Sequence, residues 1–286
     1  MLVPCGVLSA QSTGAVYKEG NALIWNESFQ GSSNVLGQVM KLDNTLGYSF
    51  NRYLALEGGL PIYFVHASST AAASGARSGN GLGNLYADMR LTLTNPLINY
   101  QSTLTGTAPT GDRDKGFSTG RATFDWNNHF DRNLGPLRPF ADLGVANTVS
   151  DTQFFLRPFT SLGLVGHFEG GATFRLIPGV RVGASLYDIL PSGEQKVYSK
   201  LIHRGTPAVA KGSGRHHGGV FEASSVSVGG VGLVRDNGFA AWASASPIRY
   251  ITLSAGYTRS VVYDLNTFSF GVGLNLSPVL KAARHL

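Results

Sequence analysis

The chain has 286 residues, 43% of them hydrophobic and 14% charged, and its formal net charge is +6. This length suits one large β domain as well as two small ones, and the 37 glycines and 12 prolines fit a chain with many turns and few helices. No run of about 18 or more apolar residues occurs, which excludes a transmembrane helix. A transmembrane β-barrel is not excluded, because its apolar residues are spaced by two.

The start of the chain looks like the remnant of an export signal. An apolar stretch ends there in the small-residue cleavage pattern Leu8-Ser9-Ala10. We therefore expect residues 1–10 to be a signal-peptide remnant and residues 11–286 to form the barrel domain. Cys5 follows a proline, which argues against a lipid anchor, and no cysteine follows it. Disulfides and cysteine metal sites are thus excluded from the mature domain.

Apolar and polar residues alternate strictly in several segments. One is residues 85–94, and another is residues 121–131, with an apolar and a polar set (Ala122, Phe124, Trp126 and Phe130 against Arg121, Thr123, Asp125, His129 and Asp131). Because successive side chains of a strand point to opposite faces, each segment predicts a strand with one apolar and one charged face. A buried row of charges needs water or partners. A closed barrel with lipid outside and a polar lumen suits both faces.

Taken in chain order, the alternating segments predict about twelve strands. They are residues 22–28, 37–50, 52–66, 83–94, 98–110, 118–132, 137–149, 159–177, 180–190, 237–246, 249–262 and 267–277. The first, around Leu23, Ile24 and Trp25, alternates poorly, and its alternative is a periplasmic segment or a lumen plug. Counting it makes the number of strands even and places both termini in the periplasm.

The predicted connections are of two kinds. Tight reversals rich in Pro, Gly and Asn lie at residues 50–52, 94–96, 134–136, 177–179 and 246–248. Longer connections lie between them, at residues 68–80, 112–118, 150–156, 192–235 and 264–267. Outer-membrane barrels have short turns at the periplasmic end and long loops at the external end. We therefore expect the long segment 192–235 to be an external loop or a loop folded into the lumen.

The predicted strands have outward faces that are compatible with lipid. The outward set includes Leu54, Leu56, Leu60, Ile62, Phe64, Leu164, Phe168, Phe174, Leu176, Ile251, Leu253, Tyr257, Phe268, Phe270, Val272, Leu274 and Leu276. Aromatic residues near strand ends fit interfacial girdles, although aromatic residues also favour strands in general. These residues are Tyr48, Phe50, Tyr53, Tyr100, Trp126, Phe130 and Tyr250.

The opposite, inward faces carry charges of both signs. The predicted lumen set is Lys41, Asp43, Glu57, Asp88, Arg90, Arg121, Asp125, His129, Asp131, Asp142, His167, Glu169, Arg175 and Arg181. We expect ion pairs of Arg90 with Asp88 or Glu57, and of Glu169 with Arg175 or Arg181. These charges either satisfy one another and hold the wall together or set the selectivity for a solute.

A strand ending in a Pro-Thr-Gly-Asp turn carries a resemblance to a known family. The strand and turn read Gly106-Thr107-Ala108-Pro109-Thr110-Gly111-Asp112, and Ser118-Thr119-Gly120-Arg121 then leads into the strand that bears Trp126. Over residues 85–190 the chain resembles Gram-negative outer-membrane barrels of the "MetA-pathway of phenol degradation" transporter family. The resemblance implies uptake of small, often apolar or aromatic, molecules through the outer membrane.

The most basic stretch of the chain lies at residues 194–217, where one acid stands against five bases (Lys196, Lys200, Arg204, Lys211 and Arg215). On an external loop these charges would meet lipopolysaccharide phosphates or draw anions to the mouth of the barrel. The other interpretation is a solvated loop, which Lys211-Gly212-Ser213-Gly214 favours. Tyr198 is the only aromatic residue of the stretch, which argues against nucleic-acid binding.

Metal binding and catalysis are weakly supported. His203, His216 and His217 lack an acid or cysteine at ligand spacing, so we predict no metal and no cofactor. Asp125, His129 and Asp131 share one inward face and form the best candidate catalytic group. Filling of the lumen by polar side chains explains them better, and we predict that the protein is not an enzyme.

The sequence thus predicts an all-β fold, a single transmembrane antiparallel β-barrel in the outer membrane of a Gram-negative bacterium. A soluble sandwich is the alternative fold. Three functions remain open: a passive channel for small molecules, a structural or interaction barrel with a filled lumen, and, with least support, a barrel hydrolase. Expected partners are outer-membrane lipid, lipopolysaccharide, a small solute and the barrel-assembly machinery. A homo-oligomer is also open.

Overall fold

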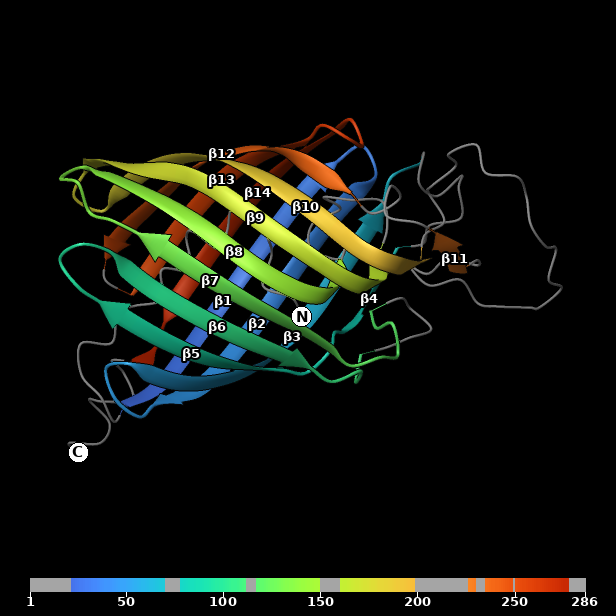
Figure 1. The fold of residues 1–286 in the computed structure, drawn as a ribbon, viewed down its shortest axis with the longest axis horizontal. Helices are drawn as coiled ribbons and strands as arrows, with labels where there is room; N and C mark the ends of the chain where they lie inside the picture. Colours follow the sequence, from blue (N-terminus) through green and yellow to red (C-terminus); the bar gives the residue numbers. More distant parts are fainter. Residues whose placement is uncertain are drawn as a thin grey trace, which may run out of the picture.

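Each barrel strand pairs with two antiparallel neighbours, and the first strand pairs with the last, so the barrel has no free edge (Figure 1). The computed structural model describes residues 22–69, 78–111, 117–149, 160–198, 226–229, 235–248 and 250–277. The twelve barrel strands are β1 (Ala22–Asn34), β2 (Gly37–Ser49), β3 (Leu54–Ala67), β5 (Tyr86–Thr94), β6 (Asn99–Thr107), β7 (Thr123–Asp131), β8 (Leu137–Val149), β9 (Thr160–Ile177), β10 (Val180–Tyr198), β12 (Asp236–Ile248), β13 (Ile251–Ser260) and β14 (Leu265–Asn275).

The predicted twelve-strand antiparallel barrel is confirmed, including its weakest strand. β1 pairs with β14 from Asn26 opposite Asn275 to Ser33 opposite Phe268, and it pairs with β2 along its whole length. It runs to Asn34, well beyond the predicted end at Ser28. Glycine, serine and asparagine weaken the alternation there, but neighbours on both sides hold the strand.

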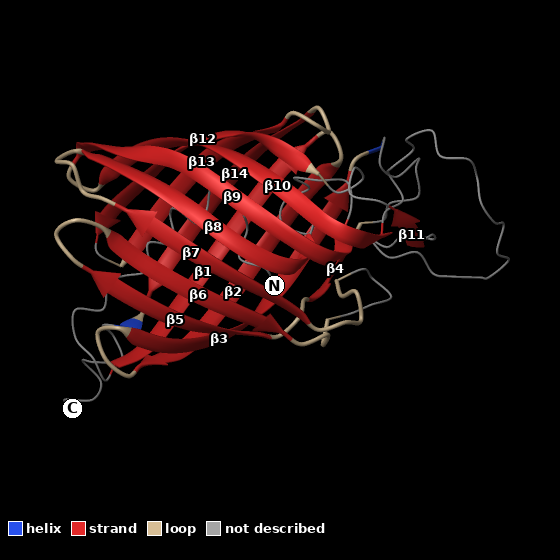
Figure 2. Ribbon diagram, in the orientation of Figure 1, coloured by secondary structure: helices blue, strands red, loops and turns tan. Residues whose placement is uncertain are grey.

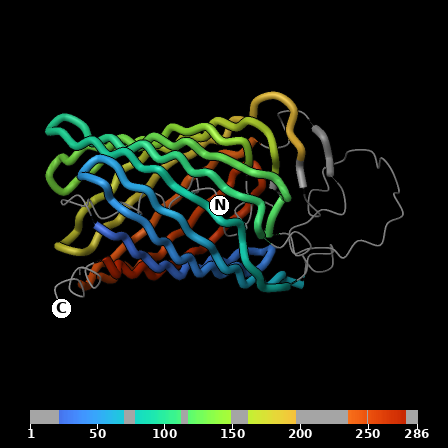
Figure 3. Tube along the Cα trace, turned by 90° about the horizontal axis from the view of Figure 1, so that it is seen from below, coloured from blue at the N-terminus to red at the C-terminus, as the bar shows by residue number. Residues whose placement is uncertain are grey.

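The two ends of the barrel differ as predicted. Strand pairs β2–β3, β5–β6, β7–β8, β9–β10 and β12–β13 are joined by short turns at one end, and the longer connections lie at the other (Figures 1 and 3). One two-residue turn is Pro178-Gly179, where Gly179 has a φ of 83°. Proline followed by a residue with positive φ is the pattern of a type II turn, which glycine adopts without steric cost.

Two short strands extend the sheet at the long-loop end (Figures 1 and 2). β4 (Gly79–Leu82) pairs with β3 beyond the end of β5, and β11 (Val226–Gly229) pairs with the last residues of β10. Two predicted boundaries were therefore wrong. β10 continues through the predicted start of the loop at residue 192 to Tyr198, because β9 and β11 supply partners on both sides. The predicted strand 83–94 starts too early, because β5 begins at Tyr86 and the residues between β4 and β5 belong to neither strand.

The outer surface of the barrel is apolar. Residues predicted to face outward are exposed in the structure, among them Leu56, Phe64, Leu164, Phe168, Phe174, Leu176, Leu253, Phe268 and Phe270. Leu186 on β10 is 70% exposed. A continuous apolar face of this kind on a closed barrel is suited to lipid. None of the described residues forms a helix that is long and apolar enough to cross a membrane.

Aromatic side chains gather near the short-turn end. The Tyr48 and Phe50 ring centroids lie 5.3 Å apart, and those of Tyr100 and Phe130 lie 5.0 Å apart. All four belong to the predicted girdle, and each lies within a few residues of a short turn. Trp126 was grouped with them, but it lies toward the other end of β7 and donates a hydrogen bond to Ser102.

Candidate functional site

The two sides of the lumen differ in chemistry. Charged side chains cover the wall formed by β2 to β9, where Lys41, Asp43, Asp125, Asp131, Asp142, His167 and Glu169 are all buried. The inward positions of β13 and β14 instead hold small neutral residues with one leucine (Thr252, Ser254, Gly256, Thr258, Ser260, Leu265, Thr267, Ser269, Gly271 and Gly273). Charge is therefore concentrated on one half of the wall.

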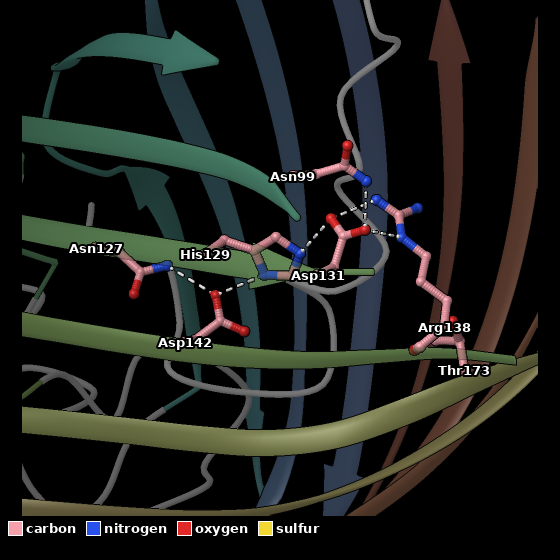
Figure 4. Close-up of polar contacts among 7 residues, drawn as sticks. All are labelled: Asn99, Asn127, His129, Asp131, Arg138, Asp142 and Thr173. Atoms are coloured by element: carbon pink, nitrogen blue, oxygen red, sulfur yellow. Dashed lines mark hydrogen bonds and ion pairs between the residues drawn. The ribbon is translucent and has the colours of Figure 1, made fainter. Parts of the chain in front are cut away.

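An ion-pair network occupies the lumen face of β7 and β8 (Figure 4). Arg138 binds both oxygens of Asp131 through Nε and Nη2, each at 2.7 Å, and Asn99 Nδ2 donates to Asp131 at 2.8 Å. His129 lies between two carboxylates, with Nε2 3.3 Å from Asp131 and Nδ1 3.0 Å from Asp142. An imidazole donates from both nitrogens only when it is protonated, so this position favours the charged ring.

Asp142 connects this network to β9. Its Oδ1 accepts from His129 and from Asn127, whose Nδ2 lies at 3.1 Å. Glu169 is the residue directly opposite Asp142 in the β8–β9 register. The two carboxylates therefore face the lumen side by side.

His167 on β9 reaches across a whole strand. Its Nε2 lies 2.9 Å from Asp125 on β7, while Gly144 on the intervening β8 lies under the imidazole ring. A Cβ atom at position 144 would collide with that ring. Glycine at this position allows the ion pair to lie flat against the wall.

Tyr86 on β5, on the other side of the charged wall, also reaches across a glycine of the intervening strand to a carboxylate. Its hydroxyl lies over Gly59 of β3 and contacts Asp43 at 3.1 Å and Thr45 at 2.9 Å, both on β2. Lys41 Nζ binds the other oxygen of Asp43 at 3.2 Å. Each oxygen of Asp43 thus has a donor.

One predicted ion pair forms between β3 and β5, and a hydrogen bond that was not predicted joins β5 to β6. Arg90 forms an ion pair with Glu57, as predicted, and Asp88 accepts a hydrogen bond from Thr105 at 2.5 Å. The register places Glu57 opposite Asp88 and Asp88 opposite Thr105. These contacts again join neighbouring strands along the wall.

A smaller polar group and an aromatic pair lie on the β10–β12 side. Asp236 accepts from Ser260 at 2.6 Å and from Tyr187 at 3.3 Å. Phe140 on β8 and Trp242 on β12 approach with ring centroids 6.0 Å apart. Their rings cover glycines of the two strands between them, Gly171 and Gly183.

The first three residues of the Pro-Thr-Gly-Asp motif, Pro109 to Gly111, lie at the long-loop end of β5 and β6. Leu85 N donates to the Thr110 hydroxyl at 2.7 Å, and Gly111 N donates to Asn84 Oδ1 at 3.0 Å. Past this motif, Phe117 stacks on Tyr63 with parallel rings 5.7 Å apart. Val39 and Val65 complete this buried apolar cluster, which we call the mouth cluster (Val39, Tyr63, Val65 and Phe117).

Three predicted lumen arginines lie at the ends of the barrel, away from the ion-pair network. Arg121 is exposed and precedes β7, because the strand begins only at Thr123. Arg175 and Arg181 lie opposite each other, exposed at the short-turn end. The predicted pairing of Glu169 with them is wrong, because six residues of strand span about 20 Å.

Several lumen residues were missed by the sequence analysis. Arg138 follows the same alternation as Asp142 and could have been found from it. No alternating row of charges in the sequence includes Asn99, Tyr86 or Asp236. Their roles depend on neighbours that the strand register brings together. Trp242 lies among alanines that resemble an outward face, and the glycine opposite it on β10 makes room for its ring.

The geometry gives little support to catalysis. Both ring nitrogens of His129 are engaged by carboxylates, and Ser102 lies on the outer face, where it accepts from Trp126. Within the described ranges, no group of three or more histidine, cysteine and acidic residues could hold a metal ion. Of the predicted basic loop, the structure describes Lys196, which is exposed on β10; the other four bases and the three candidate metal-binding histidines lie outside the described residues, as does the predicted signal remnant.

Comparisons with known proteins agree on the fold. The crystal structure of an outer membrane channel from Pseudomonas putida F1 is 14% identical, with a TM-score of 0.56, and the match covers 92% of this chain and 100% of that chain. The NanC porin is 7% identical with a TM-score of 0.48, covering 87% of this chain and 98% of that one. No family model and no curated protein matches. The family suggested by the Pro-Thr-Gly-Asp turn stays a prediction.

Proposed function

We propose that this protein is a channel in the outer membrane of a Gram-negative bacterium, through which small solutes diffuse passively. The observation that carries the proposal is the way in which lumen charges are neutralised. His167 and Tyr86 each reach a carboxylate two strands away across a glycine, so their side chains lie along the wall. The wall formed by β13 and β14 carries mostly small side chains. Both features keep the side chains of these strands close to the wall, as a passive channel requires.

The location follows from the outer surface. An exposed apolar face around a closed barrel is stable in lipid and unfavourable in water. The proposal agrees with the fold that the chain shares with the outer membrane channel of Pseudomonas putida F1. Contact with membrane lipid and lipopolysaccharide follows from this location, as does folding by the barrel-assembly machinery.

The solute class is suggested by the mouth cluster. Phe117 and Tyr63 stack in a buried aromatic, apolar cluster at the long-loop end of the lumen. Small apolar or aromatic molecules that enter from this end would pass close to this cluster. The resemblance of residues 85–190 to a transporter family points to the same class.

A structural barrel with a filled lumen is the second candidate. The contact between Phe140 and Trp242 favours it, because two large aromatic rings meet there in a buried apolar cluster on the lumen side. The two candidates differ in one measurable property, which is the passage of ions and solutes.

Single-channel recording in a planar lipid bilayer tests the proposal. The full chain is refolded in detergent, and heat-modifiable migration on a gel confirms that it is folded before it is added. We expect discrete conductance steps that the heat-unfolded sample does not give. Folded protein that inserts but gives no steps would reject the channel and favour the filled barrel.

A further inference from the structure

Two carboxylates face each other directly on the lumen wall. Asp142 of β8 and Glu169 of β9 are register partners, and each is 5% exposed. Opposed residues on antiparallel strands have Cβ atoms about 4.5–5.5 Å apart, and like charges in this position repel. Such a pair is stable only with positive charge nearby, and the partner that the wall supplies, His129, contacts only Asp142 of the two.

The oxygen atoms of this pair are only partly used. Among the described residues, Asp142 Oδ2 and Glu169 Oε1 have no hydrogen-bond donor, and the same holds for the neighbouring Asn127 Oδ1. Other lumen carboxylates differ, since Asp131 and Asp43 each have donors on both oxygens. The donors that the wall supplies to Asp142, from His129 and Asn127, both reach Oδ1.

We propose that Asp142, Glu169 and Asn127 form a weak binding site for small monovalent cations inside the lumen, which makes the channel conduct cations in preference to anions. Carboxylate and amide oxygens are the ligands that hard cations take in proteins. Three protein oxygens are fewer than the roughly six to eight ligands of a calcium site. A cation here would keep part of its water and leave easily, as conduction requires.

This inference rests on the proposed channel function and assigns it a selectivity. The test is the potassium-to-chloride permeability ratio, obtained from the reversal potential of the full-length channel in a KCl gradient. The wild-type channel is compared with Asp142→Asn/Glu169→Gln, in which both side chains keep their shape and lose their charge. We expect the wild type to prefer potassium and the double variant to lose that preference, with a fall in the ratio of roughly tenfold.

A matched control removes the same charge outside the lumen. Glu27 on β1 and Asp188 on β10 occupy outward positions, next to Leu274 and Phe168 in the register, so Glu27→Gln/Asp188→Asn should leave the ratio unchanged. Heat-modifiable migration checks the folding of every variant. An anion-selective wild type, or an equal fall in both double variants, would overturn the site while leaving a channel. A folded wild type without conductance would overturn the channel and the site together.

Discussion

The imidazole ring of His167 lies over Gly144, in the space that a Cβ atom at that position would occupy. From there Nε2 reaches Asp125 on the far side of β8. A side chain at position 144 would lift the ring from the wall and separate the charged partners. The ion pair therefore depends on the absence of a side chain in the strand between them.

Substitution Gly144→Ala should lower the free energy of unfolding by about 1–3 kcal/mol, because it leaves a buried carboxylate without its partner. Urea-induced unfolding of the refolded barrel in lipid vesicles measures this. Gly106→Ala is the matched control: a Cβ there would meet no atom within 4 Å. Its effect should stay within about 0.5 kcal/mol. Equal losses in the two variants would show that the contact with His167 is not the cause.

Arg138 should not be replaceable by lysine. Its two contacts with Asp131 are made by different nitrogens of one planar group, which an ammonium cannot reproduce. We expect Arg138→Lys to lose about 1 kcal/mol of stability and Arg138→Ala to lose about 1–3 kcal/mol, with allowance for partial exposure. The same unfolding assay ranks the three proteins. Full stability in Arg138→Lys would show that charge alone is enough.

An arginine placed on the outer face should destabilise the barrel, and the cost should be larger in the middle of a strand than in a turn at its end. Leu186 in the middle of β10 and Val35 in the turn between β1 and β2 are 70% and 69% exposed. Leu186→Arg should cost about 2–4 kcal/mol in a bilayer, and Val35→Arg about 0–1 kcal/mol. Folding into vesicles measures both. Similar costs would mean that the middle of the barrel does not lie in the hydrocarbon.

Phe117 should limit flow at the external mouth. Because its ring packs on Tyr63 within the mouth cluster, Phe117→Ala removes apolar bulk from that end of the lumen. We expect a larger single-channel conductance for Phe117→Ala and a value near wild type for Phe117→Leu, which keeps most of the bulk. Identical conductance in all three would place the narrowest point elsewhere.

The sequence predicted the fold well because one physical rule governs most of it. A strand between lipid and a polar lumen must alternate with period two, and this rule identified β3, β7, β9 and β14 with their faces. The rule fails where the environment changes. The β9–β10 register shifts after Ser192, and the last residues of β10 are held by β9 and β11 rather than by alternation.

The site was less predictable because its contacts depend on register. Alternation placed Asp142 and Glu169 in the lumen, but it could not show that they are opposite each other. It also extended the inward face back to Arg121, which precedes β7 and directly follows the bend at Gly120, where φ is 71°. The role of Gly144 could not be predicted from the sequence either, because it depends on the His167 ring that lies over it.

The pairing of β1 with β14 has a consequence for synthesis. One edge of β1 forms its backbone hydrogen bonds with β14, which is synthesised much later. Until then two rows of unpaired backbone groups would face lipid, at a cost of several kcal/mol for each group. A chain that ends before Leu265 lacks β14 and cannot close the barrel, so it is not stable in the bilayer. Truncated products should therefore stay outside the bilayer, where proteases can remove them.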